Sequence, residues 1–197
     1  MTPRPAYHHG DLRRTLLDVS LALIEEQGLA GLSLREVARR AGVTHQAPYH
    51  HFADRPALLA ALADEGFLLL LASMQEEQAK AHRAPASQLA AAGRGYVHFA
   101  LAHPAHFRLM FRPELCPDAP PSVAGGASYQ LLVDAVTALQ RSGGVPKKDA
   151  ATLIALCWSA VHGLASLFLD GGLAQADPRR AAREMMALLV RLIAAGA

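Results

Sequence analysis

Ser159 and His162 stand one helical turn apart, which is the spacing that a nucleophile and its base would need on a helix. A pair of that kind also needs an acid that orients the base and donors that stabilise an oxyanion, and neither is evident. The sequence has no GxSxG, HExxH or glycine-rich phosphate-loop pattern. We therefore expect that the protein is not an enzyme.

Metal binding is the second chemistry that side chains of this kind could support. No carboxylate or thiol completes a ligand set at a useful spacing with the candidate residues, which are His98, His103, His106 and His162. Cys116 and Cys157 form no CxxC pair, which favours reduced thiols in an intracellular protein. The N-terminus is polar and contains proline, unlike a signal peptide. We expect no metal, no cofactor and a cytoplasmic location.

A binding function is indicated between residues 33 and 52. Ser33 and Glu36 are spaced as a capping box, in which the serine hydroxyl accepts from the Glu36 amide and the carboxylate returns to the Ser33 amide. Gly42 can supply a left-handed turn, and Thr44 can cap a third short helix. Two short helices joined by such a turn are typical of a DNA-reading helix-turn-helix, although plain helical corners use the same devices.

The motif resembles the N-terminal domain of TetR-family regulators over about residues 7–60. The resemblance rests on three runs, Gly28-Leu29-Ala30-Gly31-Leu32-Ser33-Leu34-Arg35-Glu36-Val37-Ala38, Ala41-Gly42-Val43-Thr44 and Ala47-Pro48-Tyr49-His50-His51-Phe52. The run Cys157-Trp158-Ser159-Ala160-Val161-His162-Gly163 is similar to the Trp-His-Gly signature of one C-terminal domain type of that family. The resemblance implies a helical body that dimerises and often holds an effector pocket.

The resemblance also implies which residues contact DNA. The first residues of the third helix face base edges in that family, and here they are His45 and Gln46, which can pair with guanine and adenine respectively. The other expected DNA-binding residues are Arg35, Thr44, Tyr49, His50, His51 and Arg55. Pro48 departs from the family pattern and removes an amide, so the third helix is expected to start late or to be tightly wound. Ala53 also departs from it, because lysine is frequent there.

The composition and punctuation of the chain predict an all-α fold. The chain has 197 residues, of which 52% are hydrophobic and 18% charged, so a sizeable core is available. The formal net charge of +2 does not by itself indicate a nucleic-acid partner. Glycine and proline divide the sequence into about nine helices. We expect a three-helix DNA-binding domain over residues 1–55 and a helical bundle for effector binding and dimerisation over residues 56–197. In the bundle we expect a loop at 113–126 and helices at 128–142, 147–170 and 178–195.

The expected helix at 147–170 is apolar all round, so it must be covered on every side. Polar residues interrupt it, so burial against neighbours or a partner subunit is a better interpretation than a membrane span. A two-fold four-helix contact with the last helix would give a homodimer. An apolar cavity for a small-molecule effector has as candidate lining residues Phe99, Phe107, Met110, Trp158, His162 and Phe168, although each alone is more often a core residue.

These features predict a TetR-like transcriptional regulator. We expect a repressor that binds a near-palindromic double-stranded DNA operator as a homodimer, with its affinity controlled by an unknown small molecule. The alternative is a helical ligand-binding or adaptor protein that does not bind an operator, and the intact set Gln46, Tyr49, His51 and Arg55 argues against it.

Overall fold

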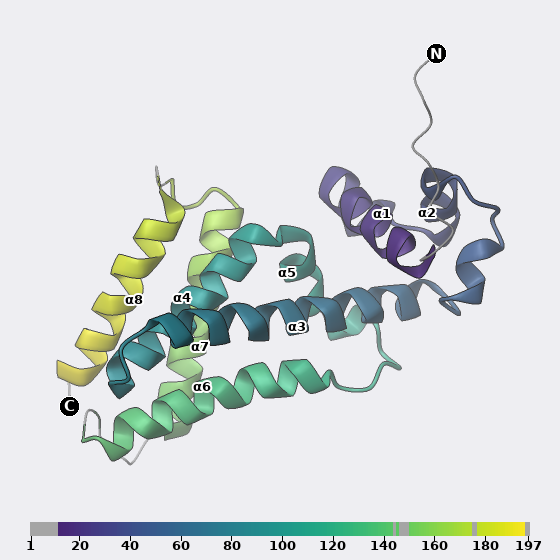
Figure 1. The fold of residues 1–197 in the computed structure, drawn as a ribbon. Helices are drawn as coiled ribbons and strands as arrows, with labels where there is room; N and C mark the ends of the chain where they lie inside the picture. Colours follow the sequence, from purple (N-terminus) through teal and green to yellow (C-terminus); the bar gives the residue numbers. More distant parts are fainter. Residues whose placement is uncertain (1–11, 144, 146–149, 175–176, 196–197) are drawn as a thin grey trace.

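The chain folds into α-helices and short 3-10 helices, and the residues that the structure describes contain no strand (Figure 1). The computed structural model describes residues 12–143, 145, 150–174 and 177–195. The expected all-α fold is confirmed.

The N-terminal part begins with α1 (Leu12–Gln27), η1 (Leu29–Gly31) and α2 (Leu34–Ala41). The third helix of the motif is η2 (Ala47–His50), a 3-10 helix rather than an α-helix. A first hydrophobic core joins these elements and includes Leu16, Leu23, Val37 and Phe52. This core fixes the orientation of the two short elements that form the motif.

Helix α3 (Arg55–Lys80) connects the N-terminal part to the rest of the chain. Asp54 caps its start, because the Asp54 carboxylate accepts from the Ala57 amide at 2.8 Å. Its first turns place Leu58 and Leu62 in the first core, and its later turns place Leu70 and Met74 in a second core. One continuous helix therefore contributes to both cores and spans the molecule (Figure 1). A division into domains at residue 55 stays a prediction.

The body packs around α3 and α4. Its elements are α4 (Pro85–Ala102), α5 (Pro104–Met110), η3 (Pro113–Leu115), α6 (Val123–Arg141), α7 (Ala150–Leu169) and α8 (Pro178–Ala195). The expected loop at 113–126 is too long, because Ser122 accepts from the Gly125 amide at 3.2 Å and starts α6 at Val123. The expected range of the last helix agrees with α8. The expected start of the preceding helix, at 147–149, lies outside the described residues.

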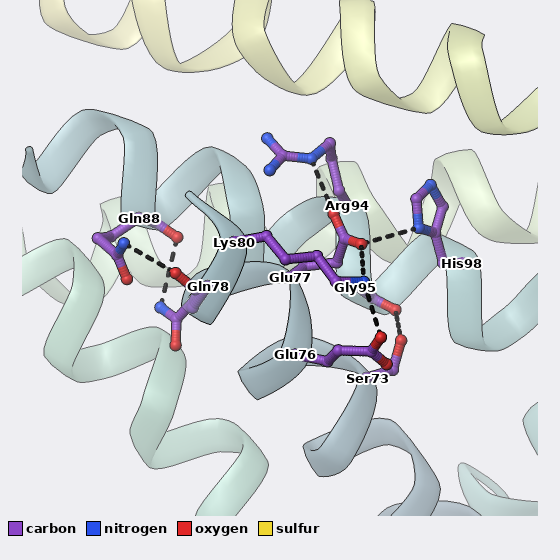
Figure 2. Close-up of polar contacts among 9 residues, drawn as sticks. All are labelled: Ser73, Glu76, Glu77, Gln78, Lys80, Gln88, Arg94, Gly95 and His98. Atoms are coloured by element: carbon purple, nitrogen blue, oxygen red, sulfur yellow. Dashed lines mark hydrogen bonds and ion pairs between the residues drawn. The ribbon is translucent and has the colours of Figure 1, made fainter. Parts of the chain in front are cut away.

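Helices α3 and α4 cross at very close range at Gly95. A Cβ atom on Gly95 would lie 2.6 Å from both the Met74 Cα and the Ser73 carbonyl oxygen, so a side chain would collide with backbone. The Ser73 hydroxyl donates to the Gly95 carbonyl oxygen at 2.8 Å at the same crossing (Figure 2). Glycine is required at this position for contact rather than for backbone conformation.

A polar cluster extends this crossing along the helix pair (Figure 2). The Glu77 carboxylate accepts from Arg94 Nε at 3.2 Å and lies 3.7 Å from His98 Nδ1. Gln78 and Gln88 each donate a side-chain amide to the other's backbone carbonyl, at 3.3 and 3.1 Å. These contacts fix the register of α3 on α4.

Two helices, α3 and α7, are long and apolar enough to cross a membrane by length and composition alone. Core helices of globular proteins pass the same test. Helix α3 packs against α4, α5 and α6, and α7 packs against α4 and α6. Their apolar character is therefore weak evidence for a membrane.

Candidate nucleic-acid interface and small-molecule cavity

The first helix of the motif is capped at both ends. Ser33 is extended, and its hydroxyl accepts from the Glu36 amide at 3.2 Å, which confirms one half of the predicted capping box. The other half is wrong, because the Glu36 carboxylate accepts from Arg39 Nε and Nη2 at 2.8 and 2.6 Å instead. This ion pair holds the pKa of the Glu36 carboxyl below its usual value.

Gly42 ends α2 in the left-handed conformation expected for it, with φ 71° and ψ 27°. The Val43 amide donates to the Ala38 carbonyl at 3.0 Å, which closes the turn. Ala38 is fully buried, so the neighbouring element can approach α2 closely. The turn therefore sets the angle at which the chain enters η2.

Pro48 determines the form of the third helix. It is fully buried at the second position of η2, and it can donate no amide hydrogen bond. The Ala47 amide bonds to the Thr44 carbonyl at 3.0 Å and the Tyr49 amide to the Gln46 carbonyl at 3.1 Å, both across three residues. The expectation that this helix starts late or is tightly wound is confirmed, and both features are present. It begins at Ala47 rather than directly after a Thr44 cap.

The predicted DNA-binding residues lie on one exposed segment with two outliers, Arg35 and Arg55. Exposed or half-buried side chains come from the turn and η2, and they are Thr44, His45, Gln46, Tyr49, His50 and His51. Tyr49 is 46% exposed, whereas Phe52 is 4% exposed and belongs to the first core. Arg35 on α2 is exposed and makes no ion pair within the described part of the chain. The segment thus presents many donors and acceptors, and Arg35 adds a positive charge on the preceding helix.

Arg55 is half-buried and already engaged. Its Nε donates to the Leu32 carbonyl at 2.9 Å and its Nη2 to the Leu29 carbonyl at 2.7 Å. These bonds satisfy carbonyl groups at η1 and attach it to the start of α3. The predicted phosphate contact would have to use the remaining N–H groups of the guanidinium.

Two further cations near the motif are paired. Arg39 bonds to Glu36, and Arg40 bonds to Glu26 of α1. Arg13, which the sequence did not single out, lies 5.4 Å from the centre of the Phe52 ring. Its position at the start of α1 carries no spacing signal that would have identified it.

An ion pair and a neighbouring imidazole join α1 to α3 and α5. Arg14 of α1 donates from Nη1 to Glu65 of α3 at 2.6 Å, and the other Glu65 oxygen lies 3.3 Å from His106 Nε2 on α5. His106 is 4% exposed, and burial lowers the pKa of its imidazole, although Glu65 opposes this. Three helices therefore meet at one carboxylate. This meeting could not be foreseen from the sequence, because the three residues are far apart in the chain.

The body contains an apolar, partly open cavity of about 320 Å³ between α3, α4, α6, α7 and α8. Of the candidate lining residues, Trp158 lies on its wall. The wall as described does not include the others, which are Phe99, Phe107, Met110, His162 and Phe168. Phe99, Phe107 and Met110 are buried in the second core, whereas Tyr96, Phe111 and Phe67 provide rings on the wall. His162 reaches the cavity indirectly, because its Nδ1 lies 2.8 Å from the Tyr96 hydroxyl.

The sequence and fold match known proteins at both ends of the chain. Residues 16–62 match the family model described as bacterial regulatory proteins, tetR family. Residues 89–191 match the model described as Tetracyclin repressor-like, C-terminal domain.

Solved structures cover nearly the whole chain. A protein with unknown function from Rhodococcus sp. RHA1 is 38% identical, with a TM-score of 0.79 over 97% of this chain and 100% of that one. The TetR family transcriptional regulator PfmR from Thermus thermophilus is 18% identical, with a TM-score of 0.71 over 89% and 97%. The fatty acid degradation regulator FadR from Bacillus halodurans is 14% identical, with a TM-score of 0.72 over 93% and 96%. At those two low identities the likeness concerns the fold alone.

Proposed function

The chain belongs to the TetR family of bacterial regulatory proteins, and from this premise we propose that it is a cytoplasmic repressor that binds a near-palindromic DNA operator. The observation that carries the proposal is the segment from Thr44 to His51, which follows the Gly42 turn and exposes its polar side chains while Pro48 is buried beneath them. Gln46 can read an adenine edge and His45 a guanine acceptor, while Tyr49 and His51 can donate to phosphates.

Selection of bound sequences from a random double-stranded DNA pool tests operator binding. We expect one near-palindromic motif to be enriched, with half-sites about one helical turn apart, on the order of 34–36 Å. Gln46→Ala should reduce enrichment at one base pair of each half-site, and the matched control Gln75→Ala, an exposed residue of α3, should leave the motif intact. Absence of any enriched sequence would favour a helical adaptor protein instead.

We also propose that the protein is a homodimer joined through α7 and α8. One face of each helix carries large apolar side chains that the rest of the chain leaves exposed, including Leu156, Leu167, Leu188 and Leu192, at 51%, 48%, 49% and 62%. Such a face is costly in water and fits a four-helix contact with a second copy. A Cβ atom at Gly163 would meet nothing within 4 Å, so a partner helix can approach there.

Sedimentation equilibrium tests the dimer. Leu192→Glu should shift the protein to monomer at micromolar concentration, because a charge would be buried without a partner. Leu68→Glu is the matched control, since Leu68 is 60% exposed but lies on α3, away from that face. Monomeric wild-type protein, or equal effects of the two substitutions, would contradict the assignment.

We further propose that a small molecule in the 320 Å³ cavity controls DNA affinity. Two walls of the cavity come from α7 and α8, and a third comes from α3, which begins directly after the motif. The Arg14–Glu65–His106 contact attaches α1, which packs against the motif helix α2, to the body. Occupation of the cavity can therefore bias both the separation of the two motifs in a dimer and the orientation of each one.

A further inference from the structure

The wall of the cavity carries no formal charge. Its nineteen lining residues, all within the described ranges, include no aspartate, glutamate, lysine, arginine or histidine. Burial raises the pKa of the Cys157 thiol to about 11, and burial also raises the pKa of Tyr96. The cavity is therefore neutral at physiological pH, and a charged ligand would lose its hydration there without a counter-charge.

The wall has few polar groups, and the two serines among them already form hydrogen bonds within α6. The Ser128 hydroxyl donates to the Ala124 carbonyl at 2.8 Å, within its own helix. Ser122 Oγ accepts the capping bond from Gly125. Tyr96 is different, because its hydroxyl pairs with the His162 Nδ1 at 2.8 Å, and burial lowers the pKa of His162 so that the imidazole stays neutral.

The Tyr96–His162 pair leaves one hydrogen bond for a ligand whichever tautomer is present. The Trp158 indole N–H also interacts with the Tyr96 oxygen. If His162 Nδ1 donates, the Tyr96 O–H is free to donate, and if Nδ1 accepts, the acceptor capacity left on the Tyr96 oxygen lies beside the Trp158 contact. A hydroxyl group on a ligand, which both donates and accepts, satisfies either arrangement. The pair is thus a neutral polar anchor on a mostly apolar wall, on which Tyr129, Trp158 and Ser122 carry further hydroxyl and N–H donors.

The size and lining of the cavity favour flat rings. Its volume is about twice that of the roughly 150 Å³ cavity that holds one benzene molecule. Aromatic rings meet at steep angles on the wall, Phe67 with Phe111 at 5.6 Å and Tyr129 with Trp158 at 5.8 Å between centroids. A ring placed among them gains the edge-to-face contacts that aromatic groups prefer.

We propose that the effector is an uncharged molecule of about two rings that carries one hydrogen-bonding group, which pairs with the Tyr96 hydroxyl. The proposal rests on the proposed role of the cavity as the effector site. It excludes carboxylates, phosphates and ammonium compounds as the preferred ligands of the apolar cavity.

Isothermal titration calorimetry with three two-ring probes of matched shape tests the charge preference. The probes are 2-naphthol, 2-naphthoate and 2-naphthylmethylammonium. We expect saturable binding of 2-naphthol at one site per chain, and at least about tenfold weaker binding of the two ions. Equal or tighter binding of either ion would overturn the proposal, as would failure of 2-naphthol to bind.

Variants locate the site. Tyr96→Phe should weaken 2-naphthol about five- to tenfold and leave 2-methylnaphthalene, which has no hydroxyl, unchanged. Ala92→Phe should block both probes, because Ala92 lies on the wall and a ring there would occupy the cavity. Ala72→Phe is its matched control, since Ala72 is an exposed residue of α3 outside the wall. Equal loss of both probes in Tyr96→Phe would overturn the role of the hydroxyl.

DNA binding is measured separately, by fluorescence anisotropy of an operator selected as above, with and without 2-naphthol. Calorimetric binding with unchanged DNA affinity would uphold the ligand class and refute effector control. Altered DNA affinity by an ion rather than by 2-naphthol would uphold effector control and refute the ligand class.

Discussion

Arg55 stabilises the fold through two carbonyl groups and is predicted to contact a DNA phosphate, and a pair of substitutions separates these two roles. The guanidinium donates to the Leu29 and Leu32 carbonyls, and its remaining N–H groups carry the predicted phosphate contact. Arg55→Lys keeps the positive charge but loses the planar fork that reaches two carbonyls. Arg55→Gln loses the charge as well.

The two hydrogen bonds of Arg55 determine the expected loss of unfolding free energy. A hydrogen bond from a charged donor contributes about 1.5–3 kcal/mol, and partial exposure of Arg55 reduces this. We expect Arg55→Gln to lower the free energy of unfolding by about 2–4 kcal/mol and Arg55→Lys by about 1–2 kcal/mol. Each phosphate contact adds about 0.9 to the slope of log affinity against log salt. In a homodimer Arg55→Gln should therefore reduce this slope by nearly two, and Arg55→Lys should leave it unchanged.

Urea denaturation measures the first effect, and operator affinity by anisotropy between about 50 and 200 mM salt measures the second. An unchanged salt slope in Arg55→Gln would refute the phosphate contact. Unchanged unfolding of Arg55→Lys would show that the carbonyl bonds add no stability. The unfolding free energy and the salt slope are measured independently, so each of the two roles of Arg55 is tested separately.

Two other substitutions follow from single features. Gln46→Ala should cost about 1–3 kcal/mol of operator affinity, confined to one base pair of each half-site, and uniform weakening across sequences would contradict base reading. Gly95→Ala should lower the free energy of unfolding by about 1–3 kcal/mol or more, because its Cβ meets the backbone of Met74. Gly126→Ala is the control, since a Cβ there meets nothing within 4 Å and alanine favours a helix by about 1 kcal/mol. Equal unfolding curves for these two variants would refute the close crossing.

The features that were predictable from the sequence depend on neighbouring residues. Ser33 and Asp54 cap their helices, and Gly42 takes its left-handed turn, because each acts on amides or carbonyls only a few positions away. Pro48 likewise tightens η2 through its own missing amide. The Glu36 half of the capping box failed for an equally local reason, since Arg39 one turn later offers two charged donors in place of one backbone amide.

The features that were missed depend on contacts between distant segments. Gly125 and its neighbours suggested a loop, but at Gly125 the absence of a side chain allows α6 to pack against the Phe67 ring of α3, where a Cβ would lie 3.3 Å away. Tertiary packing therefore overrides the low helix propensity of glycine there. The lining of the cavity also depends on how distant helices pack, since Tyr96 of α4 lies on the wall whereas Phe99 is buried in the second core. No periodicity in α4 alone distinguishes these two buried rings.

Acid should destabilise the body and its attachment to the motif, because three buried or half-buried histidines favour the neutral form in the folded state. Burial lowers the pKa of His98, His106 and His162 from the ordinary value of 6.5, with opposing carboxylates at Glu77 and Glu65 for the first two. Their contribution is complete above pH 6.5 and is lost as the pH falls below it, since the unfolded chain then takes up protons that the folded chain refuses. We expect the free energy of unfolding to fall between about pH 6.5 and 5, by up to about 1.4 kcal/mol per pH unit for each histidine.

His106→Gln should flatten part of this dependence of unfolding free energy on pH, measured by urea denaturation, whereas exposed His82→Gln should not. A slope that both variants share with the wild-type protein would mean that the His106–Glu65 contact, at 3.3 Å, lets the imidazole hold its proton equally well in the folded and unfolded chain.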